Sequence, residues 1–248
     1  SGRRRTAPPM WRFARVPPMA RLPWRQAVRF ASHRAVGHRK LPACCAVSPD
    51  GASVFVASKE GRLQALAATS GRQRWELQYG EAPTVFNPSP DGASIFVGTR
   101  TGELHAVAAI SGERRWSRGF GNGSLNPLVV SPDGTRIFFG TSAGTLHAVA
   151  TSSGEPRWEH RVGEEAPSDW CFLVSPDGAS VIFWAGDGQV HALGAASGEH
   201  QWAHRPEDGA PPIDWSLFAT TDGATILFTT IDARLHALSA ITGERRWV

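Results

Sequence analysis

One phrase of eleven residues recurs five times in this chain, and that repetition restricts the available folds more than any other feature. Its first and last copies are ALAATSGRQRW (65–75) and ALSAITGERRW (237–247). The copies between them end at Trp116, Trp158 and Trp202. Self-similarity at a period of about 40–45 residues is typical of folds in which one supersecondary unit stacks on the next.

A second recurring motif fixes the length of each unit. Ser-Pro-Asp-Gly begins at residues 48, 89, 131 and 175, and Thr-Thr-Asp-Gly begins at residue 220. From this anchor to the next tryptophan the distance is always 27 residues, whereas from a tryptophan to the next anchor it grows from 14 to 18. The unit is therefore constant, and all variation in length lies in the segments that join the units.

Each unit predicts four short strands. In the third unit these are NPLVV (126–130), TRIFFGT (135–141), TLHAVA (145–150) and the segment around Trp158. Tight turns separate them, because Pro in SPDG pre-sets φ and Gly accepts a left-handed conformation. Four antiparallel strands, repeated, predict an all-β propeller with five visible blades, either as a five-bladed ring or as part of a larger ring. A β-solenoid is less favoured, because its coils are shorter and need no recurring aromatic residue.

The pattern A-x-x-x-x-[ST]-G-x-x-x-W resembles the repeat of pyrroloquinoline-quinone-type (PQQ-like) β-propellers over residues 41–248. The resemblance implies that each of these tryptophans packs on the adjoining blade: Trp75, Trp116, Trp158, Trp202 and Trp247. The family's usual Asp, two residues after the alanine, is missing from every unit. We therefore expect docking that is looser or held by packing alone. WD-repeat propellers are structurally related, but no unit here ends its third strand in Trp-Asp.

The N-terminal part differs in composition from the rest. Residues 1–49 contain ten Arg, one Lys and no acidic residue, although the net charge of the whole chain is only +4. We therefore predict a basic Arg/Pro-rich arm at 1–40 and a propeller domain at 41–248. Three interpretations of the arm stay open: a remnant of a mitochondrial or plastid transit sequence, a nucleic-acid-binding segment, and an extension that clasps the ring or a protein partner. We favour the clasp.

The cysteines are relevant to the question of whether the protein holds a cofactor. Cys44, Cys45 and Cys171 are too few for a disulfide framework and fit a reducing compartment. Some quinone-dependent alcohol dehydrogenases, which the repeat resembles, carry a vicinal disulfide over the quinone. Adjacent side chains of a regular strand point to opposite faces, so such a bridge needs a distorted peptide. We interpret Cys44 and Cys45 as two buried thiols that act as small hydrophobic residues, and we predict no cofactor.

Histidine occupies one repeat position in four units, at His105, His147, His191 and His236. A ring of histidines suggests a metal site. The third strand, however, lies about two strand spacings of 4.8 Å from the channel, which places equivalent atoms more than ~10 Å apart. A Zn–N bond measures only about 2 Å. We therefore predict that these histidines are a structural feature of the repeat and do not form a metal site.

The variable connections share one face of a propeller, and the tight turns share the other. The two longest connections each carry an Asp-Trp pair, Asp169-Trp170 and Asp214-Trp215. Two interpretations stay open: side chains that fill space and cap turns, or an aromatic and acidic patch that grips a basic or extended partner. These four residues are the candidate partner-binding site.

No catalytic motif of the HExxH, GxSxG or phosphate-loop type occurs in the chain. The sequence therefore favours a non-catalytic scaffold that binds another macromolecule, in the first place a protein, as a subunit of a larger assembly. The alternative is a quinone-dependent oxidoreductase or a fragment of one. No run of apolar residues is long enough for a transmembrane helix.

The clasp hypothesis predicts a role for the arm in stability. Only one residue follows Trp247, whereas 10–16 and 23–30 resemble the missing part of the outer strand. Deleting residues 1–40 should lower the melting temperature, by roughly 2–4 °C for each kcal/mol lost, or promote association through the exposed sheet edge. Thermal unfolding and light scattering measure the two effects. If the truncated protein is equally stable and monomeric, the arm serves only to bind a partner or to target the protein to an organelle.

Overall fold

The computed structural model describes residues 44–248 apart from 82, 122, 163–170, 186 and 207–215. Its strands form five four-stranded antiparallel sheets, each made of consecutive strands, which confirms the all-β propeller class. Blade 1 consists of β1 (Cys44–Val47), β2 (Ser53–Ala57), β3 (Arg62–Ala67) and β4 (Gln73–Gln78). Blade 2 consists of β5 (Pro83–Pro88), β6 (Ser94–Thr99), β7 (Glu103–Ala108) and β8 (Arg114–Gly119).

The remaining three blades repeat the same order. Blade 3 consists of β9 (Leu125–Val130), β10 (Arg136–Thr141), β11 (Thr145–Ala150) and β12 (Pro156–Arg161). Blade 4 consists of β13 (Phe172–Val174), β14 (Ser180–Trp184), β15 (Val190–Gly194) and β16 (His200–His204). Blade 5 consists of β17 (Phe218–Ala219), β18 (Thr225–Thr229), β19 (Leu235–Ser239) and β20 (Arg245–Trp247).

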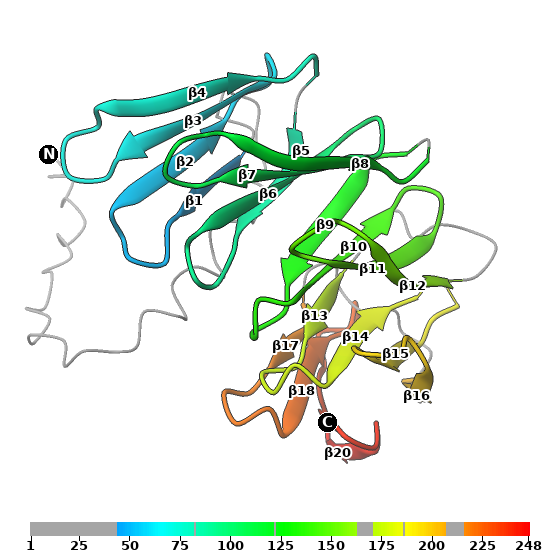
Figure 1. Ribbon diagram of the computed structural model, residues 1–248. Coiled ribbons are helices and arrows are strands. Elements are labelled where there is room, and N and C mark those ends of the chain that lie inside the picture. The colour runs from blue at the N-terminus through cyan, green and yellow to red at the C-terminus, as the bar shows by residue number, and fades with distance from the viewer. Residues whose placement is uncertain (1–43, 82, 122, 163–170, 186, 207–215) are drawn as a thin grey trace, which may run out of the picture.

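The five sheets follow one another in an open arc, with blade 1 and blade 5 at opposite ends (Figure 1). Among the first strands, β5 contacts both β1 and β9. Of the two expected arrangements, the closed five-bladed ring is therefore not the one that the structure forms. The basic arm at 1–40 lies outside the described residues.

The middle strands of blades 2 to 4 are largely buried on both faces. All six residues of β6 are buried, as are five of the six in β10, because each interior sheet is covered by a blade on either side. A strand covered on both faces reads as a continuous apolar run, such as IFV or IFF, rather than an alternation. The outer strand β8 is exposed apart from a half-buried Trp116, so the core lies in layers between the sheets.

The SPDG anchor closes the hairpin between the first two strands. In blade 1, Gly51 has a φ of 71° and its N–H donates to the Ser48 carbonyl at 2.8 Å. The Ser48 hydroxyl donates to the Asp50 carboxylate at 2.5 Å, and the Ala52 N–H donates to the same oxygen at 3.0 Å. These hydrogen bonds, with Ser48 first, lower the pKa of Asp50 from its usual value. The anchor is thus a self-contained turn.

The outer-strand tryptophan of each of the first four blades docks on the next blade. Trp75 Nε1 donates to the backbone carbonyl of Ala109 at 2.9 Å. A Cβ on Gly112 would lie 2.8 Å from the Trp75 ring, so glycine is needed where the indole rests. We call this pair of contacts the tryptophan lock. It recurs at Trp116 with Thr151 and Gly154, at Trp158 with Ala195 and Gly198, and at Trp202 with Ala240 and Gly243.

One feature of these contacts differs from the expectations. The missing Asp predicted docking by packing alone, but a backbone carbonyl accepts the indole N–H in all four locks. Trp247 is 49% exposed, and none of the described residues forms a blade on which it could dock, so its predicted docking stays a prediction. Trp247 nevertheless keeps the repeat register, pairing with Ala237 as Trp75 pairs with Ala65.

We expect the locks to dominate the stability of the blade joints. Trp75→Ala should cost about 3–5 kcal/mol, as truncation of a buried tryptophan does, because it removes a hydrogen bond and leaves a cavity. Trp247→Ala, made at the same repeat position but half exposed, should cost less than about 1 kcal/mol. Urea unfolding of both variants measures the difference, and equal losses would contradict the importance of the lock.

Glycine variants supply an independent control. Gly112 and Gly71 occupy the same hairpin position, with φ of 76° and 67°, so alanine is strained at both. A Cβ at Gly112 meets Trp75, whereas a Cβ at Gly71 meets nothing within 4 Å. Gly112→Ala should therefore be the more destabilising by about 1–3 kcal/mol, the usual cost of overpacking.

Candidate interaction face

The two edges of the arc carry different connections. One edge holds the anchor hairpins and the hairpins between third and fourth strands. The other edge holds the hairpins between second and third strands and the links from one blade to the next, and we call it the variable face. The links lengthen along the chain, from the one between Gln78 and Pro83 to the one between His204 and Phe218. Asp169, Trp170, Asp214 and Trp215 belong to the last two links and lie outside the described residues.

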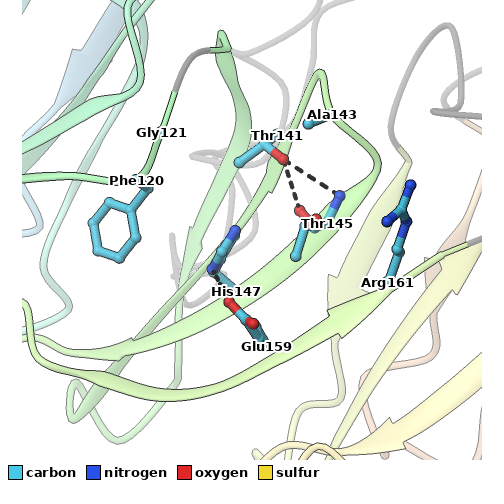
Figure 2. A pocket seen from close by; sticks show the side chains of 8 residues that line it. All are labelled: Phe120, Gly121, Thr141, Ala143, Thr145, His147, Glu159 and Arg161. Atoms are coloured by element: carbon cyan, nitrogen blue, oxygen red, sulfur yellow. Dashed lines mark hydrogen bonds and ion pairs between the residues drawn. The ribbon is translucent and has the colours of Figure 1, made fainter.

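A hollow of about 480 Å³ opens on the variable face where blade 2 meets blade 3. Its walls come from the start of the link after β8, the hairpin between β10 and β11, and the outer strand β12, as Figure 2 shows. Eight residues line it: Phe120, Gly121, Thr141, Ala143, Thr145, His147, Glu159 and Arg161. The walls thus come from two adjoining blades, which the Trp116 lock also joins.

The hollow is lined by both polar and apolar side chains. His147 stacks on Phe139, with ring centroids 5.2 Å apart, and its Nδ1 lies 3.8 Å from a Glu159 oxygen. Burial lowers the pKa of His147, and the nearby Glu159 carboxylate opposes this shift. Glu159 and Arg161 are exposed and carry opposite charges. The arrangement offers donors, acceptors and an aromatic surface, as a recognition pocket for a polar segment does.

The recurring histidines have a local structural explanation. In blades 3, 4 and 5 the imidazole stacks on a phenylalanine directly opposite it on the second strand, with the two rings within 15° of parallel. The pairs are Phe139–His147, Phe183–His191 and Phe228–His236. Within the described part of the chain, no group of three or more His, Cys, Asp or Glu is arranged to hold a metal ion. The repeated histidine therefore completes a cross-strand aromatic pair.

In blade 2 the repeat histidine belongs to a buried cluster and does not stack on a phenylalanine across the strands. His105 faces Val97 across the strands, so its ring instead lies 5.1 Å from the ring of Tyr79, which follows β4. Neither ring nitrogen of His105 nor the Tyr79 hydroxyl has a well-oriented hydrogen bond in the described residues. Burial raises the pKa of Tyr79 to about 12. Burial, followed by the charge of Arg114, lowers the pKa of His105, while Glu103 opposes that shift.

The cysteines differ in part from the sequence interpretation. Cys45 is exposed rather than buried and forms no disulfide. The same repeat position holds Phe86, Leu128 and Phe172, which are 3–8% exposed. Those residues are covered by the preceding blade, whereas none of the residues described from Cys44 onward forms a blade before blade 1. The strand is regular at this point, because Cys44 pairs with Ala57 and Cys45 pairs with Val56.

The comparisons with known proteins match this architecture. A family model described as outer membrane protein assembly factor BamB matches residues 100–248, which is more than half of the chain. This chain belongs to that family of PQQ-repeat β-propellers. A solved structure of BamB from Moraxella catarrhalis shares 19% sequence identity with it, at a TM-score of 0.62. No curated protein gave a match.

The similarity to the Moraxella protein extends over 81% of this chain but only 62% of that one. At this identity the two share the fold, and the BamB-family member described here spans under two thirds of its relative. None of its described segments is a helix long and apolar enough to cross a membrane.

Sequence reasoning missed two kinds of site residue. The hollow beside His147 depends on where the link after β8 meets the next blade, and no motif marks that meeting point. The phenylalanine partners, in contrast, had a signal: Phe139, Phe183 and Phe228 each lie eight residues before a repeat histidine. Across a short hairpin, that spacing places the two side chains opposite each other.

The buried imidazole of His105 predicts a pH dependence of stability. Its folded pKa lies below the usual 6.5, so the unfolded chain takes up the proton first. Stability should be greatest above pH ~7 and fall as the pH drops below ~6.5, with a slope of at most about 1.4 kcal/mol per pH unit for one proton. Urea unfolding between pH 5 and 8 measures this slope. His105→Gln should flatten this slope, and a variant whose slope equals that of the wild type would contradict the assignment.

Proposed function

We propose that this BamB-family chain is a non-catalytic scaffold that binds a protein partner through its variable face, as a subunit of a larger assembly. The observation that carries the proposal is that the joints between blades are constant, whereas the links from one blade to the next vary. The lock recurs in all four interior joints, whereas length and composition vary in the links. Binding sites are characteristically built on variable loops that a rigid scaffold positions. The family description, which names an assembly factor, supports the same class of function.

The hollow at blades 2 and 3 gives this face a described recognition element. A partner segment entering it would meet the exposed Arg161 and Glu159 and the side chain of Phe120, all of which line the hollow. Polar and apolar groups occur together in non-obligate protein interfaces. From the strand order we expect the two Asp-Trp links at the same edge as the hollow, so that one elongated partner could engage all three.

A quinone-dependent oxidoreductase is the alternative function, and the geometry at Cys44–Cys45 does not favour it. The strand is regular in register, and Cys45 forms no disulfide. A vicinal bridge of the kind found over a quinone would need a distorted peptide at this point. Absorbance and mass spectrometry of the protein purified from its native source, with a search for a bound quinone, separate the two functions.

The proposal predicts that the Asp-Trp links carry binding energy. The double variant Trp170→Ala with Trp215→Ala should weaken partner capture by about 30-fold or more, as loss of tryptophan hot spots does. Its fold should remain nearly intact. Co-purification from the native source identifies the partner, and titration calorimetry with that partner measures the loss.

Matched controls keep this test specific. Ile110 and Ile241 are each 83% exposed and lie in hairpins on the opposite edge, so Ile110→Ala with Ile241→Ala should leave binding unchanged. If the tryptophan double variant unfolds while Asp169→Asn with Asp214→Asn binds normally, these tryptophans are core residues and the site assignment is wrong.

A further inference from the structure

Two imidazole rings meet on blade 4, one from β15 and one from β16. The Nδ1 atom of His191 lies 3.3 Å from the Nε2 atom of His200. The ring centroids are 5.5 Å apart, and the ring planes form an angle of 72°. His200 is exposed and the side chain of His191 is 17% exposed, so the pair is open to solvent and to small solutes.

An aspartate in the hairpin before β15 fixes the tautomer of His191. The Nε2 atom of His191 lies 3.1 Å from a carboxylate oxygen of Asp187. The Gln189 backbone N–H and side-chain amide donate to the same carboxylate, at 3.0 and 2.9 Å. Because a carboxylate only accepts hydrogen bonds, Nε2 of His191 carries the hydrogen. In the neutral ring the lone pair is therefore on Nδ1, the atom that faces His200.

The separation of the two ring nitrogens suits a bound metal ion. Two nitrogen ligands at about 2.0–2.1 Å from a tetrahedral Zn²⁺ lie about 3.3–3.4 Å from each other. The separation of 3.3 Å between His191 and His200 agrees with this value. A carboxylate that accepts from the second ring nitrogen is also the usual companion of a metal-binding histidine, and Asp187 occupies that position.

The His191 ring is held in place before any ion arrives. Its ring stacks on Phe183, with centroids 5.5 Å apart and planes within 14° of parallel. Asp187 fixes the rotation of the ring within that stack. A ligand whose orientation is already set binds without the cost of ordering its side chain.

The coordination that the structure supports is an open one. The described residues contain no group of three His, Cys, Asp or Glu side chains arranged around one ion. The His160 ring on β12 is nearby, and its pKa is lowered by burial first and then by His191 and His200. We therefore assign two protein ligands, with water in the remaining positions.

The other repeats lack this combination of residues. Unit five retains the aspartate and the first histidine, as Asp232 and His236, but has the cation Arg245 in place of the second imidazole. In units one to three the position of Asp187 holds Glu60, Thr101 and Ala143, and the position of His200 holds Gln73, Arg114 and Pro156. The facing pair is thus specific to blade 4 and is not a consequence of the repeat.

We propose that His191 and His200 bind a divalent transition-metal ion of the zinc class, and that Asp187 positions the His191 ring. The pair lies within one blade, so the distance between blades that argued against a shared ring of histidines does not apply to it. Imidazole nitrogen suits Zn²⁺, whereas Mg²⁺ prefers oxygen ligands. The site goes beyond the scaffold function proposed above and does not depend on a protein partner, because blade 4 supplies both ligands.

Titration calorimetry of the full chain, stripped of metal and free of any histidine tag, tests the site with zinc chloride. The wild type should bind one equivalent of Zn²⁺ at this site, and magnesium chloride should give no binding. His191→Gln and His200→Gln should each remove the site. His236→Gln, at the same repeat position as His191, is the matched control and should bind like the wild type.

Circular dichroism shows whether each variant is folded, and exposed His200 is the safer of the two ligand positions to change. A wild type that binds no Zn²⁺, or a His200→Gln chain that binds it like the wild type, would overturn the proposal. The same conclusion follows if His236→Gln loses as much binding as His200→Gln, because binding would then be general to the histidines.

The positioning role of Asp187 has its own test. Asp187→Asn should weaken Zn²⁺ binding by about 10–100-fold, as loss of a carboxylate partner of a ligating histidine does. Nitrogen NMR of the metal-free chain should show that His191 loses its preference for the Nε2-protonated tautomer. Unchanged affinity together with an unchanged tautomer would show that Asp187 does not position the ring.

Discussion

The contact between an indole ring and a glycine that has no side chain holds the blades of this molecule in order. Gly112 leaves the space in which Trp75 rests, and the Ala109 carbonyl accepts the N–H that burial would otherwise leave unpaired. Both halves come from one repeat phrase but act on opposite faces of a sheet. Each unit can therefore receive a tryptophan from the unit before it and dock its own on the unit after it, which sets the direction of stacking.

This stacking determines where function can reside. Sheets covered on both faces have no surface left for a partner except at their edges, and β6 illustrates this with six buried residues. Even the titratable side chain of His147 packs within such a layer, where it stacks on Phe139. The edges remain, and only one of them varies in length along the chain. Recognition by this scaffold is therefore a property of the links and of hollows between blades, such as the one beside Arg161.

Much of the fold could be predicted from the sequence, because the constant distance between anchor and tryptophan reflects a rigid unit with local hydrogen bonds. The hydrogen-bond acceptor of the lock could not, since a backbone carbonyl such as Ala109 O has no sequence signature. The exposure of Cys45 could not either, because burial at that position depends on a neighbouring blade rather than on the strand itself. The hollow beside His147 likewise arises from the placement of two blades, which repeat spacing alone does not specify.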